Sequence, residues 1–370
     1  MCLIFIFVRM ALTGADKVTM SSLRLLLLPF AWLYGGVLRL RHALYDIGSL
    51  RSHEPSLPTI VIGNLALGGT GKTPMMELVL DVLGGSSTLA TLSRGYGRRT
   101  NDLREVATED EAVSVGDEPL QVKRKFPSVH VFVGADRVAG IEAIQQRVPQ
   151  VRTVVLDDAF QHRRLQGSLN ILLTTYHAPW HKDHLLPAGR LRDVRSRRTA
   201  AHIVVVTKCP AALSTEEQKR WRTDLGLSEQ QHLYFSGITY QELRQFHGPP
   251  VSVDGNTACL LFTGIADPSP LVQHVRAHWE RVEHVAFPDH HPFGTGDLER
   301  LAERYATFAP GPKMLVTTEK DAMRLRSVIA SGALRNLPVY TIGMKASMIH
   351  QPEQFAAAIR DHVATHPTHR

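Results

Sequence analysis

The sequence is poor in cysteine. Cys2, Cys209 and Cys259 are its three cysteines in 370 residues, and no two of them stand at the short spacing of a metal or disulfide motif. This excludes a disulfide framework and a zinc finger, and it fits a reducing compartment such as the cytosol. Hydrophobic residues make up 44% and charged residues 21% of the chain, which excludes disordered and fibrous proteins.

Signatures of nucleic-acid binding are also missing. No RNP or helix-turn-helix motif accompanies the net charge of +7. No repeat of about 20 to 50 residues is visible. A basic chain without these motifs favours anionic lipid headgroups or phosphorylated substrates as partners, and no nucleic acid. At roughly 150 residues per domain, the length predicts about two domains.

No apolar run is long enough to span a bilayer. The uncharged run 25–38 is shorter than the ~20 residues required, and it contains Pro29. On a helical wheel the polar residues share one narrow face, and Leu, Phe, Trp, Tyr and Val cover the rest. This pattern favours an amphipathic helix in the membrane interface over residues 21–50, with a core helix and a spanning helix as alternatives. The residues of the narrow face are Arg24, Gly35, Arg39, His42 and Asp46.

Residues 1–20 fit the rest of the chain loosely. No basic segment precedes the apolar run 1–12, and no clear small-x-small site follows it, which argues against a signal peptide. We expect this segment to be an extension or a mis-assigned start, with Met10 or Met20 as the true first residue.

A strand, a glycine loop and a helix follow one another from residue 59 to residue 83. The β-branched run 59–62 predicts a buried strand, and the segment 74–83 has helical apolar spacing. Between them the loop 63–73 resembles a phosphate-binding loop, with Ala66 where the strict pattern has its first glycine. Its predicted cofactor-binding residues are Gly68, Gly69, Thr70, Gly71, Lys72 and Thr73.

Each residue type in this loop has a physical role. Glycines let backbone N–H groups point at phosphate oxygens, and the helix N-terminus adds positive potential. Lys72 would reach the β- and γ-phosphates, and the Thr73 hydroxyl would bind Mg²⁺. Pro210 stands where guanine-reading loops carry Asp, so ATP is the expected nucleotide. Leu67 replaces the lysine of the partition ATPases and argues against that branch.

Acidic residues for a metal follow a second strand. The strand-like run 151–156 ends in Asp157 and Asp158, either of which could hold Mg²⁺. The segment 185–198 is the densest basic stretch of the chain and suits phosphate recognition. Asp117 opens a helical segment, where a capping role and a catalytic role are both open. His290 lacks the partners of a metal site, so we expect it to pair with a carboxylate across a cleft.

Strands and helices alternate along the whole chain. The fold class predicted is α/β, with a P-loop NTPase-like, mostly parallel sheet flanked by helices. The polar stretch 240–255 is rich in Pro and Gly and predicts a boundary. We expect a P-loop domain at 51–245 and a smaller α/β domain at 246–370 that closes over the active-site cleft.

These motifs together resemble one family, the tetraacyldisaccharide 4′-kinases. The resemblance covers about Leu23 to Leu325, and the family's own loop commonly lacks the first glycine. It rests on eight segments in the family order: VIGNLALGGTGKTP, LSRGYGRR, SVGDEPLQ, DDAFQHRRL, LLPAGRLRD, FTGIADP, FPDHHPF and TTEKDAMRL.

The resemblance implies an activity and a location. The γ-phosphate of ATP would pass, with Mg²⁺, to the 4′-hydroxyl of a tetraacylated glucosamine disaccharide 1-phosphate, giving lipid IVA in lipid A biosynthesis. The enzyme would be peripheral on the cytoplasmic face of a bacterial inner membrane, on anionic lipids, with no obligate protein partner evident. Two rival functions remain, a membrane-recruited P-loop switch and a kinase of a soluble sugar or nucleotide.

The resemblance also assigns roles by motif. Asp117 matches the general base, His290 its partner, and Lys72 the catalytic lysine of the loop. Arg192 matches a residue that approaches the phosphates. The metal-side residues would be Thr73, Asp157, Asp158 and Asp193, where the family often has Glu in place of Asp193.

Overall fold

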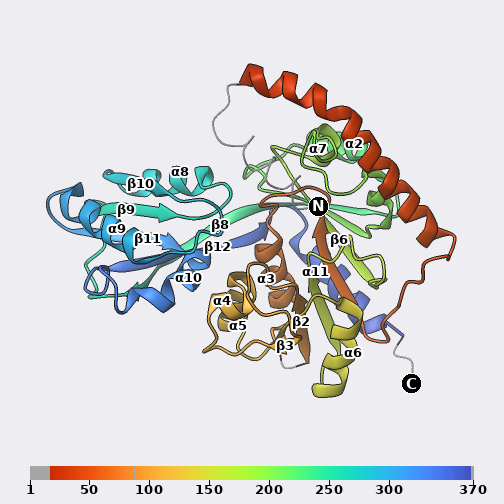
Figure 1. Ribbon diagram of the computed structural model, residues 1–370, viewed down its shortest axis with the longest axis horizontal. Helices are drawn as coiled ribbons and strands as arrows, with labels where there is room; N and C mark the ends of the chain where they lie inside the picture. Colours follow the sequence, from red (N-terminus) through yellow and green to blue (C-terminus); the bar gives the residue numbers. More distant parts are fainter. Residues whose placement is uncertain (1–16, 87, 368–370) are drawn as a thin grey trace. The chain divides into compact units, whose positions relative to one another are not determined.

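The computed structural model describes residues 17–86 and 88–367, with side chains from Leu25 onward, and Figure 1 traces the chain. The chain forms two compact units, each built from several segments. The first unit comprises Met1–Lys72, Arg152–Gly237 and Ser347–Arg370, and the second comprises Thr73–Val151 and Ile238–Ala346. The expected domains 51–245 and 246–370 stay a prediction. The interpretation of residues 1–20 falls largely on 1–16, outside the described residues.

The first unit contains a parallel sheet. Its strands are β1 (Thr59–Asn64), β5 (Thr153–Asp157), β6 (Leu169–Thr175), β7 (Ile203–Thr207) and the start of β8 (His232–His247). They lie in the order β5-β1-β6-β7-β8, all parallel. β1, β5 and β7 are buried along their whole length, which explains their continuous Val, Ile and Leu runs.

Within the described residues, the first unit contains three α-helices, and the ends of one of them show typical capping residues. These helices are α2 (Lys17–Asp46), α7 (Thr215–Leu225) and α11 (Pro352–Thr365), with short 3₁₀ turns at Trp180–Lys182 and Arg195–Ala200. Ser214 caps α7 by accepting a hydrogen bond from the Glu217 N–H, and Gly226 ends it in a left-handed conformation.

The second unit carries two groups of strands. In one, β2 (Leu89–Ser93) pairs parallel with β4 (His130–Val133), and β3 (Arg104–Glu105) pairs antiparallel with β4. In the other, β10 (Val282–Ala286), β9 (Ala258–Thr263), β11 (Lys313–Thr318) and β12 (Val339–Met348) are parallel in that order. Its helices are α3 (Lys72–Val82), α4 (Ala112–Val115), α5 (Asp117–Lys125), α6 (Arg137–Arg147), α8 (Ser269–His278), α9 (Thr295–Phe308) and α10 (Glu319–Ile329).

Strand β9 shows how the second unit packs. Leu260 and Phe262 belong to one apolar cluster, while their neighbours Cys259 and Leu261 belong to another. Successive side chains of a strand point to opposite faces, so this alternation means that both faces of the sheet are covered. The predicted class, α/β with a mostly parallel sheet and flanking helices, is confirmed.

Helix α2 packs against the first unit with its small and polar face. Ala31, Gly35, Leu38 and His42 are buried there, at intervals of three or four residues. The exposed fraction of Leu26, Leu33 and Leu40 on the other face is 63–72%. Gly35 and His42 of the predicted polar stripe therefore face the protein, while the apolar surface is open. None of the helices in the described part of the chain is long and apolar enough to cross a membrane.

The orientation of α2 predicts different effects for two of its leucines. Leu38→Ala opens a cavity beneath the helix. We expect the free energy that holds α2 in its folded position to fall by about 2–5 kcal/mol. Leu40→Ala removes an exposed side chain and should change its stability by less than about 0.5 kcal/mol. Hydrogen exchange of the α2 amides measures both, and equal effects would contradict this orientation.

Candidate active site

The glycine loop after β1 is fastened from two sides within the first unit. The Asn64 side-chain amide donates to the Thr70 hydroxyl over 2.7 Å, and the Thr207 hydroxyl donates to the Thr70 carbonyl over 2.8 Å. Gly68 and Gly71 have φ values of 107° and 83°, which favour glycine. The loop then enters α3 at Lys72. A held glycine loop at a helix N-terminus is the geometry that binds phosphate.

The backbone at position 66 does not require glycine, so Ala66 fits there. It is not among the described residues with positive φ. Instead it forms an antiparallel bridge to Leu191, and the Arg192 N–H donates to the Leu65 carbonyl over 2.9 Å. The departure from the strict loop pattern thus has a physical reason. The same pairing places the basic segment 185–198 beside the glycine loop.

Asp158 contacts the cationic side chains of Arg192 and Lys72 at the carboxyl edge of the sheet. β1 and β5 are parallel neighbours with Ile62 opposite Asp157, so both strands end at this edge. Arg192 binds both carboxylate oxygens of Asp158, one of them over 2.8 Å, and Lys72 Nζ lies 3.8 Å from Asp158 Oδ1. Three predicted site residues, Lys72, Asp158 and Arg192, are therefore brought together.

The backbone of Asp158 supports a functional reading. Its φ is 51°, in the left-handed region that non-glycine residues rarely adopt. Asp157, one residue earlier, is only 6% exposed. Strained residues of this kind persist where the surrounding structure fixes them, and they concentrate at functional sites.

Asp193 is bound to helix α2. Its Oδ1 lies 2.6 Å from His42 Nε2 and accepts a hydrogen bond from the Val194 N–H, and both Asp193 and His42 are buried. One turn before Leu38, the Tyr34 hydroxyl donates to the Arg192 carbonyl over 2.9 Å. Helix α2 therefore holds the segment that carries Arg192. The sequence reasoning did not assign His42 or Tyr34 to the site.

A Mg²⁺ ion at this edge of the sheet would need few protein ligands. Among the residues with described positions, no group of three His, Cys, Asp or Glu side chains could hold a metal by itself. Mg²⁺ is usually held by one or two carboxylates together with water and substrate phosphates. Asp158 fits that donor set, because its side chain is 32% exposed beside the glycine loop.

In the second unit, Asp117 lies where two glycine loops meet. Gly116, with φ of 95°, precedes it, and a Cβ there would come within 3.2 Å of the Gly95 backbone. A Cβ on Gly95 would lie 2.8 Å from the Val115 carbonyl. Close approach and positive φ, 67° at Gly95 and 95° at Gly116, therefore favour glycine at both positions. The contact brings the loop of Tyr96 to the start of α5.

Asp117 forms the pair with His290 that the resemblance implied. Its Oδ2 lies 3.0 Å from His290 Nδ1 and accepts a hydrogen bond from Arg324 over 3.2 Å. The Asp117 side chain is 5% exposed. Burial alone would raise its pKa, but the hydrogen bond with His290 and the charges of Lys320 and Arg324 hold the pKa of Asp117 below its ordinary value. A buried carboxylate is thus kept ionised.

His290 is also held in an unusual conformation. Its φ is 58°, and its backbone N–H donates to the Gly264 carbonyl over 3.1 Å. The Tyr96 ring lies 5.1 Å from the imidazole, centroid to centroid. The segments FTGIADP, FPDHHPF, SVGDEPLQ and LSRGYGRR all contribute to this environment.

Two residues of α10 complete the environment and were missed by the sequence reasoning. Lys320 Nζ lies 3.2 Å from His290 Nε2, and Arg324 also donates to the Gly264 carbonyl over 2.9 Å. Both stand in the segment TTEKDAMRL, four residues apart on one helix face. This spacing after a buried strand was the signal that could have found them.

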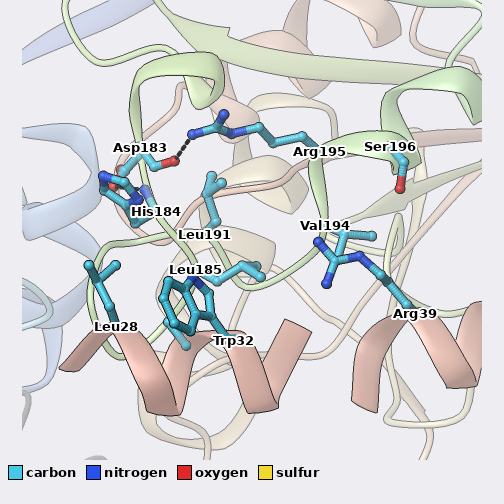
Figure 2. A pocket seen from close by; sticks show the side chains of 11 residues that line it. Leu28, Trp32, Arg39, Asp183, His184, Leu185, Leu191, Val194, Arg195 and Ser196 are labelled. Carbon is cyan, nitrogen blue, oxygen red and sulfur yellow. Dashed lines mark hydrogen bonds between the residues drawn. The ribbon is translucent and has the colours of Figure 1, made fainter. Parts of the chain in front are cut away.

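A cavity of about 430 Å³ lies between α2 and the segment 183–196 (Figure 2). Leu28, Trp32 and Leu185 give it an apolar wall, and Arg39 and Arg195 lie at its edge. An apolar cavity bordered by guanidinium groups suits an acyl chain attached to an anionic headgroup.

Comparisons with known proteins agree with this geometry. The family model for tetraacyldisaccharide-1-P 4′-kinase matches residues 23–364. The chain belongs to this family. A tetraacyldisaccharide 4′-kinase of Phocaeicola vulgatus is 36% identical over 91% of this chain and 94% of its own. One from Flavobacterium johnsoniae is 38% identical over 93% and 98%.

A solved structure of the family shares the fold. LpxK from Aquifex aeolicus, crystallised in complex with ATP, is 26% identical with a TM-score of 0.71, covering 92% of this chain and 99% of its own. The resemblance stated from the eight segments is confirmed, and the comparisons support a kinase and not a nucleotide switch. The roles of individual residues stay predictions.

The buried pair of His42 and Asp193 is expected to contribute to the stability of the protein. His42→Ala removes the donor and leaves the Asp193 carboxylate buried with one partner fewer, which should cost about 3–5 kcal/mol of unfolding free energy. Arg39→Ala, on an exposed part of the same helix, is the control and should cost less than about 0.5 kcal/mol. Urea titration measures both. A cost below about 1 kcal/mol for His42→Ala would show that the pair contributes little.

Proposed function

We propose that the chain transfers the γ-phosphate of ATP to the 4′-hydroxyl of a tetraacylated glucosamine disaccharide 1-phosphate. The observation that carries the proposal is the pairing of an ionised, buried Asp117 with His290 in a chain that also holds a phosphate loop. A nucleotide switch has no need of such a base. The names of the relatives and the ATP complex of the family's solved structure support the same reaction.

Lys72 and Arg192 are the cations proposed for the triphosphate. Both contact Asp158, so the site already concentrates positive charge at one carboxylate. The loop of Gly68 to Gly71 supplies backbone donors. Transfer of a phosphoryl group depends mainly on positioning and on neutralising charge, which these groups provide.

Thr73, Asp157 and Asp158 are the residues proposed to hold Mg²⁺, which would neutralise charge on the β- and γ-phosphates. Asp193 was expected on the metal side as well. Because its Oδ1 already accepts from His42 and the side chain is buried, we propose that Asp193 acts on the site by holding the Arg192 segment.

Asp117 is the proposed general base. The sugar oxygen bonds to the γ-phosphorus, the bond from that phosphorus to the bridging oxygen breaks, and the hydroxyl proton goes to Asp117. A positioned base of this kind contributes about 10²- to 10⁴-fold in rate. Domain closure over the bound substrates stays the proposed means of excluding water.

Helix α2 is proposed to bring the enzyme to the lipid. Its exposed leucines and Trp32 offer an apolar face, Arg39 and Arg41 offer charge to anionic lipids, and the cavity beside it would take part of an acyl chain. These features support peripheral attachment to a membrane. The cytoplasmic face of the inner membrane is proposed from the resemblance.

Label transfer tests the reaction. Purified protein, Mg²⁺ and γ-labelled ATP are mixed with tetraacyldisaccharide 1-phosphate in detergent micelles. We expect label in the lipid, no transfer with Lys72→Ala, and a loss of about 10²-fold or more with Asp117→Ala.

Each other outcome rejects a part of the proposal. Transfer that survives Asp117→Ala would keep the kinase and discard the base. ATP hydrolysis without label in the lipid would favour the switch function. Efficient transfer to a soluble sugar or nucleotide in place of the lipid would overturn the substrate assignment.

Vesicle sedimentation tests the role of α2. Replacing Leu26, Leu33 and Leu40 together by Asp should weaken binding to anionic phospholipid vesicles by at least about 100-fold, because each buried leucine contributes about 1.5–3 kcal/mol. Val113→Asp and Val253→Asp, which add carboxylates at exposed apolar positions elsewhere, are the controls and should bind nearly as the parent does. Unchanged sedimentation of the triple variant would exclude α2 as the membrane contact.

A further inference from the structure

We propose that Lys320 is a positioning residue that engages Nε2 of His290 and so keeps the imidazole proton on Nδ1, which leaves Asp117 as the group that accepts a proton. The tautomer follows from the geometry. Its catalytic consequence rests on the function proposed above.

His290 lies between a carboxylate and an ammonium group. Its Nδ1 is 3.0 Å from Asp117 Oδ2, and its Nε2 is 3.2 Å from Lys320 Nζ. Lys320 Nζ also lies 2.9 Å from Glu118 Oε1. The Lys320 side chain is 18% exposed, and it reaches both partners from α10. The two ring nitrogens of His290 therefore face groups of opposite hydrogen-bonding character.

Lys320 is surrounded by carboxylates that keep it charged. Burial would lower its pKa, but Glu118, Asp117 and Asp289 raise the pKa of Lys320 above its ordinary value. An ammonium group has three donors and no acceptor. His290 Nε2 must therefore accept from it, which requires a lone pair on Nε2. The proton of the neutral imidazole then lies on Nδ1 and is donated to Asp117.

The remaining groups near His290 show what Lys320 prevents. Asp289 Oδ2 lies 3.9 Å from His290 Nε2, and Glu118 bonds to Lys320 itself. Arg324 is bound to Asp117, and Tyr96 contacts the imidazole with its ring. Without Lys320, the Asp289 carboxylate would face Nε2 and favour a proton on that nitrogen. The ammonium group occupies the position where that proton would sit.

This arrangement decides where the substrate proton goes. His290 Nδ1 already carries a proton, and Nε2 is engaged by Lys320, so the imidazole has no free site for another. The hydroxyl proton therefore moves to Asp117 as the new phosphorus–oxygen bond forms. His290 contributes by donating to Asp117 Oδ2, while the Glu118 N–H donates to Oδ1 over 2.9 Å. The carboxylate is oriented from both oxygens.

Histidine NMR of the nucleotide-free full chain tests the tautomer without using activity. The protein is labelled with ¹⁵N-histidine, and the His290 signal is identified by its loss in His290→Gln. At about pH 8 we expect the Nδ1–H tautomer, with Nε2 accepting a hydrogen bond. Lys320→Met should remove the hydrogen-bond shift of the Nε2 signal and admit the Nε2–H tautomer, whereas Lys320→Arg, which retains the charge and donors, should keep the parent spectrum. Lys313→Met, at a lysine bonded elsewhere in the same unit, is the control and should leave His290 unchanged.

The kcat values of the same variants connect the tautomer with catalysis. Lys320→Met should lower kcat at least about 10-fold, and Lys320→Arg should not. An Nε2–H tautomer in the parent would overturn the proposal, and so would an Nε2 signal that Lys320→Met leaves unchanged. If Lys320→Met does not fold, the parent and Lys320→Arg spectra still decide. A correct tautomer in a protein that transfers no label would reject the proposed function and leave this inference standing.

Discussion

Parallel pairing of β1 with β5 and β6 is the constraint on which the proposed phosphate site depends. Because parallel strands end at the same edge, the loop after Asn64 and the acids after β5 emerge together. The bridge between Ala66 and Leu191 then adds the segment of Arg192 to that edge. A shift of register by one residue would turn every side chain of β5 to the other face and separate Asp158 from Lys72 and Arg192.

The charge of Asp117 is controlled by the residues packed around it in the second unit. Asp117 is buried, which by itself disfavours ionisation, yet Arg324, Lys320 and His290 compensate for the lost water. The two cations are in turn held by other groups: Lys320 by the Glu118 carboxylate, and Arg324 by the Asp321 carboxylate and the Gly264 carbonyl. A network closed in this way resists local rearrangement, because removing one member leaves another charge unpaired.

The glycine loop could be predicted from the sequence pattern, whereas the role of Asp117 could not. A glycine loop between a buried strand and a helix is a local pattern, so Lys72 and its neighbours could be assigned from spacing alone. Asp117 could not, since a carboxylate at a helix start has a capping role as its ordinary interpretation; only the resemblance selected a base. Lys320 and His42 were missed because their partners lie 30 and 151 residues away. The spacing of Lys320 and Arg324 indicates a shared helix face, but which residues that face contacts depends on the fold.

The apolar face of α2 also has a consequence for how the reaction would be measured. An enzyme held at an interface by such a face meets its substrate in two dimensions, so the relevant quantity is the mole fraction of substrate among the surrounding lipids or detergent. Adding inert amphiphile at constant bulk substrate would then dilute the surface and slow turnover. A Michaelis constant in bulk units would describe the composition of the assay mixture as much as the protein.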